Sequence, residues 1–278
     1  MNLHQLKSAP PWEWPGNAGS LLLATLRDES ATETDRQLAA ELAGDLVVMN
    51  DELAVALMSV LEHSGQPQEV RARAAISLGP VLEQVDIDGF EDSEDVPITE
   101  ATFHRIQKSL RRVYLDAGTP KEVRRRALEA SARAPQSWHR DAIAAAFASD
   151  DEAWKLTAVF CMQFVKGFND QILEALNSRN PDIRYEAVVA AGNWEIEAAW
   201  PHVSRLLASK TTGKTLLLAA IDAVATIRPD DAPEILSDLR NSDDDEVVGA
   251  VEEALAMAKG LSESATWDDE DEEGDEGD

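Results

Sequence analysis

One kind of helix recurs along this 278-residue chain at a nearly constant spacing. Its clearest copy spans residues 180–194, where Asn180 can cap the free backbone N–H groups, Pro181 occupies the first turn and Asp182 adds negative charge. Apolar residues at i, i+4, i+7, i+8 and i+11 then form one helix face. This face consists of Ile183, Ala187, Ala190, Ala191 and Trp194.

The copies align on the position of Arg184. The equivalent residues are Arg36, Arg71, Arg124, Trp154, Arg184, Leu216 and Val248. From residue 124 onward these positions are 30, 30, 32 and 32 residues apart. A fixed period of this length is typical of a solenoid of stacked helix pairs. Three positions later the residue is alanine in five copies, which suits helices packed about 8–10 Å apart.

We therefore predict an all-α protein, an α-α superhelix of about seven helix pairs, because each copy follows a shorter Leu-rich segment that reads as a first helix. The predicted pairs are 20–29 with 33–45; 51–63 with 67–85; 100–117 with 120–133; 138–149 with 151–165; 168–178 with 181–194; 197–209 with 213–227; and 231–241 with 245–259.

Two of these second helices, residues 68–79 (QEVRARAAISLG) and 181–187 (PDIRYEA), resemble the second helix of HEAT repeats. The short period is similar to that of the HEAT-like repeats of phycobilin lyases. The resemblance covers about residues 20–259, and the characteristic arginine stands in four of the seven copies. It implies a HEAT-repeat solenoid whose first helices form the convex face and whose second helices form the concave face.

Three segments depart from the repeat. Residues 1–19 form an N-terminal segment with a Pro/Trp cluster (PPWEWPG, residues 10–16), and we expect its two tryptophans to cover the open end of the first repeat. A ligand-like Trp/Pro patch is the alternative. Residues 86–97 are an acidic loop insertion; they do not match a calcium-binding loop, so we expect a docking segment and no metal site. We expect Gly260 to end the last helix and residues 260–278 to be a disordered acidic tail.

The chain has a formal net charge of −28, from 53 acidic and 25 basic residues. Such a charge favours solubility and opposes direct binding to nucleic acid or to an anionic membrane. One cysteine, Cys161, excludes an internal disulfide, and no apolar stretch of about 18 residues is present. The N-terminus does not read as a secretory signal. We expect a cytoplasmic monomer.

Basic residues are concentrated between positions 105 and 140, where ten of them face only three acidic residues. These ten are Arg105, Lys108, Arg111, Arg112, Lys121, Arg124, Arg125, Arg126, Arg133 and Arg140. Equivalent positions stack in a solenoid, so Arg125, Lys155 and Tyr185 should form one polar row, and Arg133, Gln163 and Asn193 a second. The candidate partner-binding residues are Arg125, Arg126, Arg133, Trp154, Lys155, Tyr185, Asn193 and Trp194. Alternatively, these arginines simply pair with the acidic loop and tail.

Motifs for catalysis are weak. The five histidines are scattered, and none precedes a glutamate, whereas HEAT-type hydroxylases hold iron on His-Glu dipeptides. The segment Thr212-Gly213-Lys214-Thr215 lacks the upstream glycine of a phosphate loop, and Cys161 falls on a predicted buried face. We therefore assign no catalytic, cofactor-binding or metal-binding residue and expect no cofactor.

The function that we expect is a non-enzymatic protein–protein interaction scaffold or adaptor that binds its partner on the concave surface. One alternative is an acidic nucleic-acid mimic or inhibitor that captures a basic protein through the acidic loop and tail. Another is an enzyme of the HEAT-like DNA glycosylase or lyase kind. Deletion of residues 262–278 separates mimicry from the scaffold, because only mimicry depends on the tail.

Overall fold

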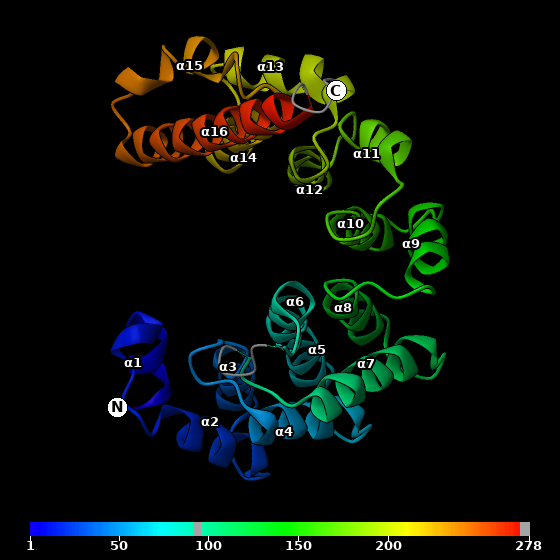
Figure 1. Cartoon of the computed structure of the whole chain (residues 1–278). Coiled ribbons are helices and arrows are strands. Elements are labelled where there is room, and N and C mark those ends of the chain that lie inside the picture. Colours follow the sequence, from blue (N-terminus) through cyan, green and yellow to red (C-terminus); the bar gives the residue numbers. More distant parts are fainter. Residues whose placement is uncertain (92–95, 273–278) are drawn as a thin grey trace, which may run out of the picture. The chain divides into compact units, whose positions relative to one another are not determined.

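The computed structural model describes residues 1–91 and 96–272, without the side chains of residues 262–272. Every regular element in the described part is a helix, which confirms the predicted all-α class. The chain divides into two compact units, Met1–Ala146 and Phe147–Asp278. In each unit, helices pair antiparallel and the pairs stack in chain order (Figure 1), which is the α-α arrangement that the repeat predicts.

The first unit is built from three helix pairs with an N-terminal extension. Its first helices α2, α4 and α7 contact one another in order, as do its second helices α3, α5 and α8. The elements are α1 (Leu3–Ser8), η1 (Pro11–Glu13), α2 (Ala18–Arg27), α3 (Glu33–Leu42), α4 (Asp51–Glu62), α5 (Gln68–Ile76), α6 (Gly79–Asp88), α7 (Glu100–Leu115), α8 (Lys121–Ser131) and α9 (His139–Phe147), which ends at the unit boundary.

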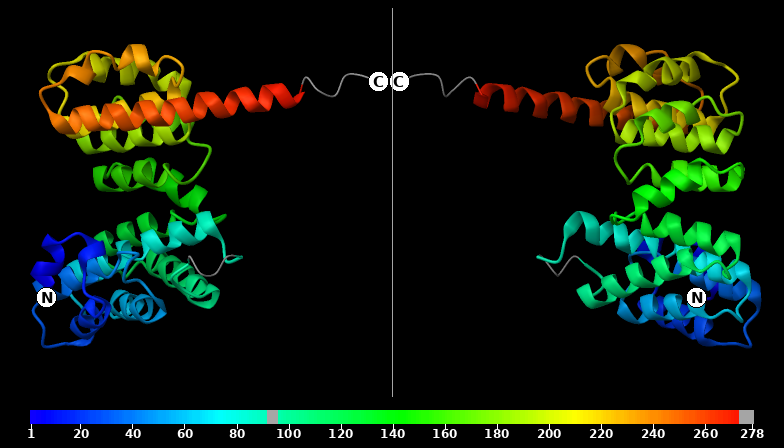
Figure 2. Two further views of the ribbon diagram at one scale, coloured as in Figure 1. Left: turned by 60° about the vertical axis from the view of Figure 1, so that its left-hand side comes forward. Right: turned by 90° about the vertical axis from the view of Figure 1, so that its right-hand side faces the viewer.

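In the second unit, the second helices α10, α12, α14 and α16 follow one another in contact. Helix α16 is the longest and lies alongside α14 (Figure 2). The elements are α10 (Glu152–Cys161), α11 (Asn169–Ala175), α12 (Pro181–Asn193), η2 (Glu197–Ala199), α13 (Trp200–Ala208), α14 (Lys214–Ile227), α15 (Ala232–Ile235), η3 (Leu239–Asn241) and α16 (Asp245–Glu272).

Short polar side chains begin several of these helices. The side-chain oxygen of Asn180 accepts the backbone N–H of Asp182 at 3.0 Å, and that of Thr99 accepts the N–H of Thr102 at 3.4 Å. The cap by Asn180 is the one expected from the sequence. Both caps pair backbone donors that a helix start otherwise leaves open.

The repeat arginine has a constant structural task in the first unit. Arg71 Nε donates to the carbonyl oxygen of Leu61 at 2.9 Å, and Arg124 Nε donates to that of Tyr114 at 2.8 Å. Arg36 reaches the carbonyl of Leu26 through Nη2 at 3.5 Å. Each acceptor lies ten residues earlier, in the last turn of the first helix of the same pair. The arginine therefore supplies a donor to a carbonyl that the helix end leaves unpaired.

The predicted second helix 67–85 is wrong as one element, because the structure breaks it into α5 and α6 at Ser77 and Leu78. Pro80 occupies the first turn of α6, where the missing N–H is tolerated; inside one continuous helix, its ring would clash with the preceding turn. Helix α6 takes residues 86–88 from the predicted loop and ends at Gly89, whose φ of +69° favours glycine.

Two predictions about the chain ends also change. Trp14 does fold back, since its Nε1–H donates to the carbonyl oxygens of Leu6 and Ala9 at 2.9 and 3.1 Å. Trp12, expected to do the same, is 80% exposed, because η1 directs it outward. Helix α16 passes Gly260 and continues to Glu272, since a single helical glycine costs only about 1 kcal/mol. The predicted disorder of residues 273–278 lies outside the described residues.

Replacement of Arg71 tests the task of the repeat arginine. We expect Arg71→Met to lower the free energy of unfolding by about 1–3 kcal/mol, because it leaves a buried carbonyl oxygen without its donor. The matched control is Arg73→Met in the same helix: Arg73 is exposed and forms a 3.9 Å ion pair with Glu41, worth about 0–1 kcal/mol. Urea unfolding measures both variants, and equal losses would contradict the assigned task.

Candidate functional site

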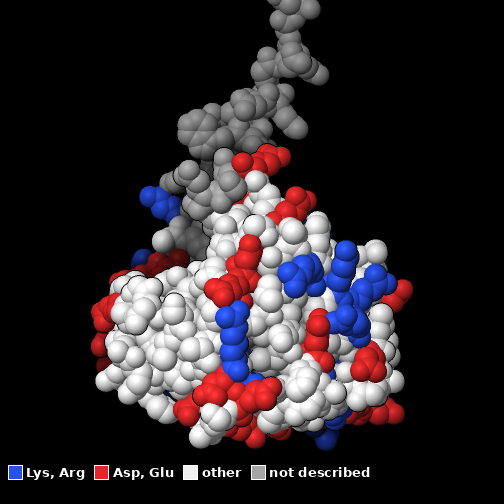
Figure 3. Space-filling view, turned by 90° about the horizontal axis from the view of Figure 1, so that it is seen from below, with Lys and Arg blue, Asp and Glu red and all other residues white. Residues whose placement is uncertain are grey.

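The predicted basic region separates into two groups on two helices. On α8, Arg125 and Arg126 form ion pairs within their own helix, whereas the cations of α7 stand on the surface. The exposed group consists of Arg105, Lys108, Arg111 and Arg112. Seen from below, Lys and Arg side chains gather on the side of the face where α7 lies (Figure 3).

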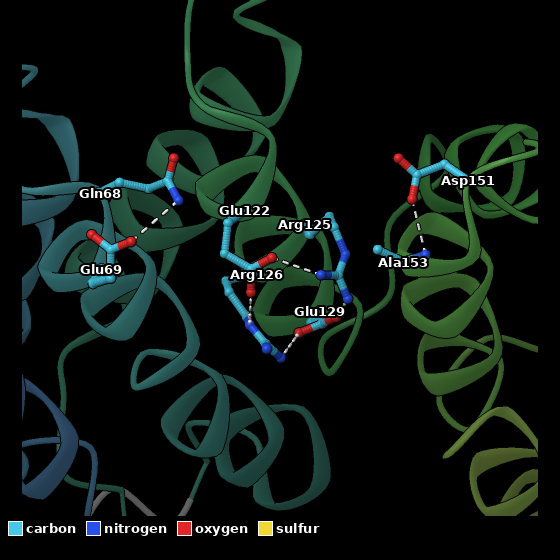
Figure 4. A network of polar contacts seen from close by, with 8 residues as sticks. All are labelled: Gln68, Glu69, Glu122, Arg125, Arg126, Glu129, Asp151 and Ala153. Atoms are coloured by element: carbon cyan, nitrogen blue, oxygen red, sulfur yellow. Dashed lines mark hydrogen bonds and ion pairs between the residues drawn. The ribbon is translucent and has the colours of Figure 1, made fainter. Parts of the chain in front are cut away.

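Arg125 and Arg126 share two glutamates of α8 (Figure 4). Arg125 Nη1 lies 2.6 Å from Glu122, and its Nη2 lies 3.7 Å from Glu129. Arg126 binds Glu122 through Nε at 2.8 Å and Glu129 through Nη1 at 2.7 Å. Burial acts to lower the pKa of Arg126, but the two carboxylates outweigh it and raise that pKa.

Arg125 was expected on the exposed side of α8, and this expectation is wrong: its side chain is only 8% exposed. Glu129 beside it is 4% exposed. Buried charges require pairing, and removal of one partner is costly. Glu122 and Glu129 stand at i−3 and i+4 from Arg125, so this pairing was already visible in the sequence.

Arg133 lies between α8 and α6, where it forms an ion pair with Glu83. A methyl group on Gly79 would lie 2.8 Å from Arg133 Cδ, so glycine leaves the room that this side chain occupies. Arg133 also lines a pocket on the second-helix side of the first unit, together with apolar residues that include Trp14, Leu42 and Ile76.

In the second unit, the candidate residues connect α12 to the segment that follows α10. Trp194 Nε1 donates to the carbonyl oxygen of Met162 at 2.6 Å, and Lys166 Nζ lies 5.3 Å from the Trp194 ring centroid. Asn193 is exposed, and its Nδ2 is 3.5 Å from the Gln163 carbonyl oxygen. Gln163 and Asn193 are therefore neighbours, as equivalent positions of adjacent repeats should be.

Trp154, Lys155 and Tyr185 are all half-buried. The rows that would join Arg125 and Arg133 to these residues stay a prediction. Within its own unit, each candidate residue is either half-buried or already in a contact, and the exposed Asn193 belongs to the second group through Gln163.

The exposed cations of α7 border a groove against α4. Phe103, Ile106 and Leu110 face the core, and the opposite face of the helix carries the cations. Arg105, Lys108 and Arg112 stand at i, i+3 and i+7, and all three line the groove. Val55 and Met58 of α4 supply its apolar part.

Polar bonds fix α7 against α4 at both ends of this groove. Asp51 Oδ1 accepts the backbone N–H of Thr99 at 2.9 Å and lies 3.2 Å from the Thr99 hydroxyl. Burial acts to raise the pKa of Asp51, but these bonds outweigh it and lower that pKa. At the other end, Glu62 accepts a hydrogen bond from Ser109 and pairs with Arg112.

The predicted basic region includes both α7 and α8, but the candidate residues taken from it, Arg125, Arg126 and Arg133, leave out the α7 surface. The signal that distinguishes them is local: residues 101–115 contain no acidic residue, whereas α8 carries two beside its arginines. Residues 101–115 therefore supply no carboxylate at i±3 or i±4, and the carboxylates that reach these cations, Glu62 beside Arg112 and Asp51 near Arg105, come from α4.

The remaining part of the described structure offers no clear catalytic or metal-binding group. Cys161 is fully buried, as expected. Among residues 1–91 and 96–272, no group of three or more His, Cys, Asp or Glu side chains is arranged to hold a metal ion. Within the same residues, no helix has the length and apolarity that a membrane span requires.

Comparisons with known proteins agree with the repeat architecture. The family model of HEAT repeats matches residues 169–256, which confirms the HEAT-repeat prediction for that segment. Similar solved structures are YibA of Escherichia coli (16% identity, 91% of this chain and 85% of that chain, TM-score 0.45), human deoxyhypusine hydroxylase in complex with glycerol (17%, 93% and 88%, 0.42) and an engineered protein (20%, 88% and 98%, 0.35). No curated protein matches the sequence.

His139 gives a prediction for the pH dependence of stability. Its Nδ1 accepts the backbone N–H of Gln136 at 2.8 Å, its Nε2 lies 3.0 Å from the Ser131 hydroxyl, and burial lowers its pKa to about 4. Between the two pKa values, the unfolded chain, with a His pKa near 6.5, binds a proton at His139 that the folded chain does not bind. From pH 7 to pH 5 this lowers the unfolding free energy by about 2 kcal/mol.

The variant His139→Gln removes this titration. We expect its unfolding free energy to be lower at pH 7 but to depend less on pH, by about 2 kcal/mol over the same interval. Urea unfolding at pH 7 and pH 5 compares the two proteins. Parallel pH profiles would show that His139 is protonated in the folded state.

Proposed function

We propose that this protein is a non-enzymatic scaffold that binds a protein partner, and that the partner presents an acidic segment to the α4–α7 groove. The observation that carries the proposal is the exposed cationic face of α7 in a chain of net charge −28. A chain with twice as many acidic as basic residues has ample carboxylate to neutralise such a face, yet residues 101–115 contain none.

The chemistry of the groove defines the partner segment. Arg105 and Lys108 attract carboxylates, while Val55 and Met58 favour apolar side chains. Exposed ion pairs contribute only about 0–1 kcal/mol each, so stable binding needs several of them together with burial of apolar surface. A peptide segment that combines Asp or Glu with apolar residues meets both requirements, and opposite charge speeds its association.

Preorganisation supports this assignment. The Asp51–Thr99 bonds and the pairing of Glu62 with Ser109 and Arg112 hold the two helices of the groove together without a partner. Binding then costs little ordering of the scaffold. The α8 arginines support the proposal less, because Arg125 and Arg126 would first have to leave Glu122 and Glu129.

The candidate residues of the second unit belong to the same proposed function as a second contact surface. Lys155 and Tyr185 stand at equivalent positions of adjacent repeats. Asn193, which is exposed, belongs to the second predicted row of polar residues. Partner binding along the second helices, as predicted from the repeat, would use these side chains. Capture of a basic protein through the acidic tail is the competing proposal, and it requires residues 262–278.

A photo-crosslinking amino acid at Ser59, which is exposed and lines the groove, tests the proposal in the full-length protein. We expect it to capture proteins through segments rich in Asp and Glu, as peptide mapping by mass spectrometry would show. The double variant Arg105→Glu/Lys108→Glu should reduce this capture about tenfold, corresponding to about 1.4 kcal/mol, and higher salt should reduce it further.

The matched control is Lys121→Glu/Arg140→Glu, which makes the same change of charge at two exposed residues of the first unit outside both α7 and the residues that line the groove. It should leave the crosslinks at Ser59 largely intact. If both double variants lost crosslinking at Ser59 equally, the loss would be due to the change in net charge, and the groove would be overturned as the site. Crosslinks to basic segments, lost on deletion of residues 262–278, would establish capture by the acidic tail instead.

A further inference from the structure

The second unit contains a pocket of unusual charge between two adjacent helix pairs. It lies where the turn after α11 meets the turn between α13 and α14. Arg184, His202 and Arg205 line it, together with the hydroxyl side chains of Ser178, Ser209 and Thr211. None of the described residues that line this pocket is acidic.

That composition stands out against the rest of the surface. Four other pockets in the described part of the chain each include at least one carboxylate, among them Glu41, Glu52, Glu29 and Glu62. With 53 acidic residues in the chain, a pocket that holds two arginines and a histidine without any acid is electrostatically exceptional. The guanidinium groups that line this pocket are hydrogen-bond donors, and the imidazole and hydroxyl groups beside them can also donate.

The pocket lies at a departure from the repeat. At the position of the repeat arginine, the sixth pair carries Leu216, and the carbonyl ten residues earlier belongs to Leu206. The hydroxyl of Thr212 donates to that carbonyl at 2.8 Å and so replaces the missing guanidinium. Both Leu206 and Leu216 line the pocket, so it lies at the place where a repeat arginine would stand.

Arg184 is less well paired than Arg71 and Arg124. Its Nη1 reaches the carbonyl oxygen of Ser178 at 3.3 Å, whereas Arg71 and Arg124 donate through Nε at 2.9 and 2.8 Å. The Nε of Arg184 is buried and, like that of Arg36, has no hydrogen-bond partner among the described residues. A buried donor without a partner is costly and rare. Arg184 also lines the pocket, and its one hydrogen bond to the described residues, through Nη1, leaves its outer N–H groups for a ligand there.

Helix α14 begins beside the same space. Its N-cap is Gly213, which provides no side-chain acceptor for the open N–H groups of the first turn, whereas α10 and α12 have Asp151 and Asn180 for this purpose. The start of a helix carries partial positive charge. It adds to the field of Arg184, His202 and Arg205.

We propose that this pocket binds a phosphate group of a small solute. Two guanidinium groups and an imidazole from two helices line the pocket together with several hydroxyl groups, and so many donors suit a tetrahedral dianion better than a planar carboxylate. Arg184 contributes from α12, while His202 and Arg205 contribute from α13, so the ligand joins two adjacent helix pairs. Its binding should therefore also stabilise the second unit.

Titration of the full-length protein with inorganic phosphate, followed by NMR chemical shifts of the backbone amides, tests this site. We expect saturable binding with a dissociation constant of about 1 mM or below, with shifts centred on residues 209–216. Arg205→Gln should weaken it about tenfold; because Arg205 is exposed, the fold should be retained. The matched control Arg240→Gln removes an exposed arginine of the same unit outside the pocket and should change nothing.

A second titration with glycerol 3-phosphate distinguishes the source of the phosphate group. Tighter binding of the ester than of free phosphate assigns the pocket to phosphomonoesters, whereas equal binding assigns it to the free ion. If the shifts do not saturate up to about 10 mM phosphate, the dissociation constant lies above that concentration and the proposal is overturned. Equal weakening by Arg205→Gln and Arg240→Gln, or equal shifts with acetate, would overturn it too.

Discussion

The hydrogen bond from the repeat arginine to the end of the first helix is the interaction on which the three helix pairs of the first unit depend. A helix leaves its last carbonyl oxygens unpaired, and the stacking of pairs then removes some of them from water. Arg71 and Arg124 place a donor at the carbonyl ten residues earlier and thereby fix the register of the second helix against the first. Asp116, at the C-cap of α7, accepts hydrogen bonds from Thr119 and Gly118, which contribute most to its lowered pKa, and it also interacts electrostatically with Arg71 and Arg124. The arginines of two neighbouring pairs therefore act on one carboxylate.

The sequence predicts much of the fold because these signals are local. Caps such as Asn180, the arginine position and the small residues of the stacking face all lie within one helix or its turn, so the period reveals the pairs. The errors occur where one local signal opposes another. Pro80 breaks a predicted helix from within its apolar pattern, and Gly260 is too weak a signal to end a helix that the residues on both sides favour.

The candidate surface was harder to predict because charge in a sequence does not reveal pairing in space. Positive residues on α7 and α8 look alike in composition, yet Glu122 and Glu129 engage the α8 arginines, while residues 101–115 of α7 include no acid. Spacing at i±3 and i±4 distinguishes the two helices in principle. No local pattern shows that Arg125 is buried, because burial depends on which elements cover α8.

In a repeat protein, a departure from the repeat is where function and structure are most readily separated. The arginine position carries a structural task, so its loss must be compensated, and Thr212 does this for the Leu206 carbonyl. A threonine hydroxyl fills far less space than a guanidinium. The exchange satisfies the backbone, and beside it lies a pocket where Arg184 keeps its charge without a full set of partners. Leu216, the residue that departs from the repeat, is apolar, yet it stands beside a pocket that the hydrogen-bond donors of Arg184, in the neighbouring repeat, also line.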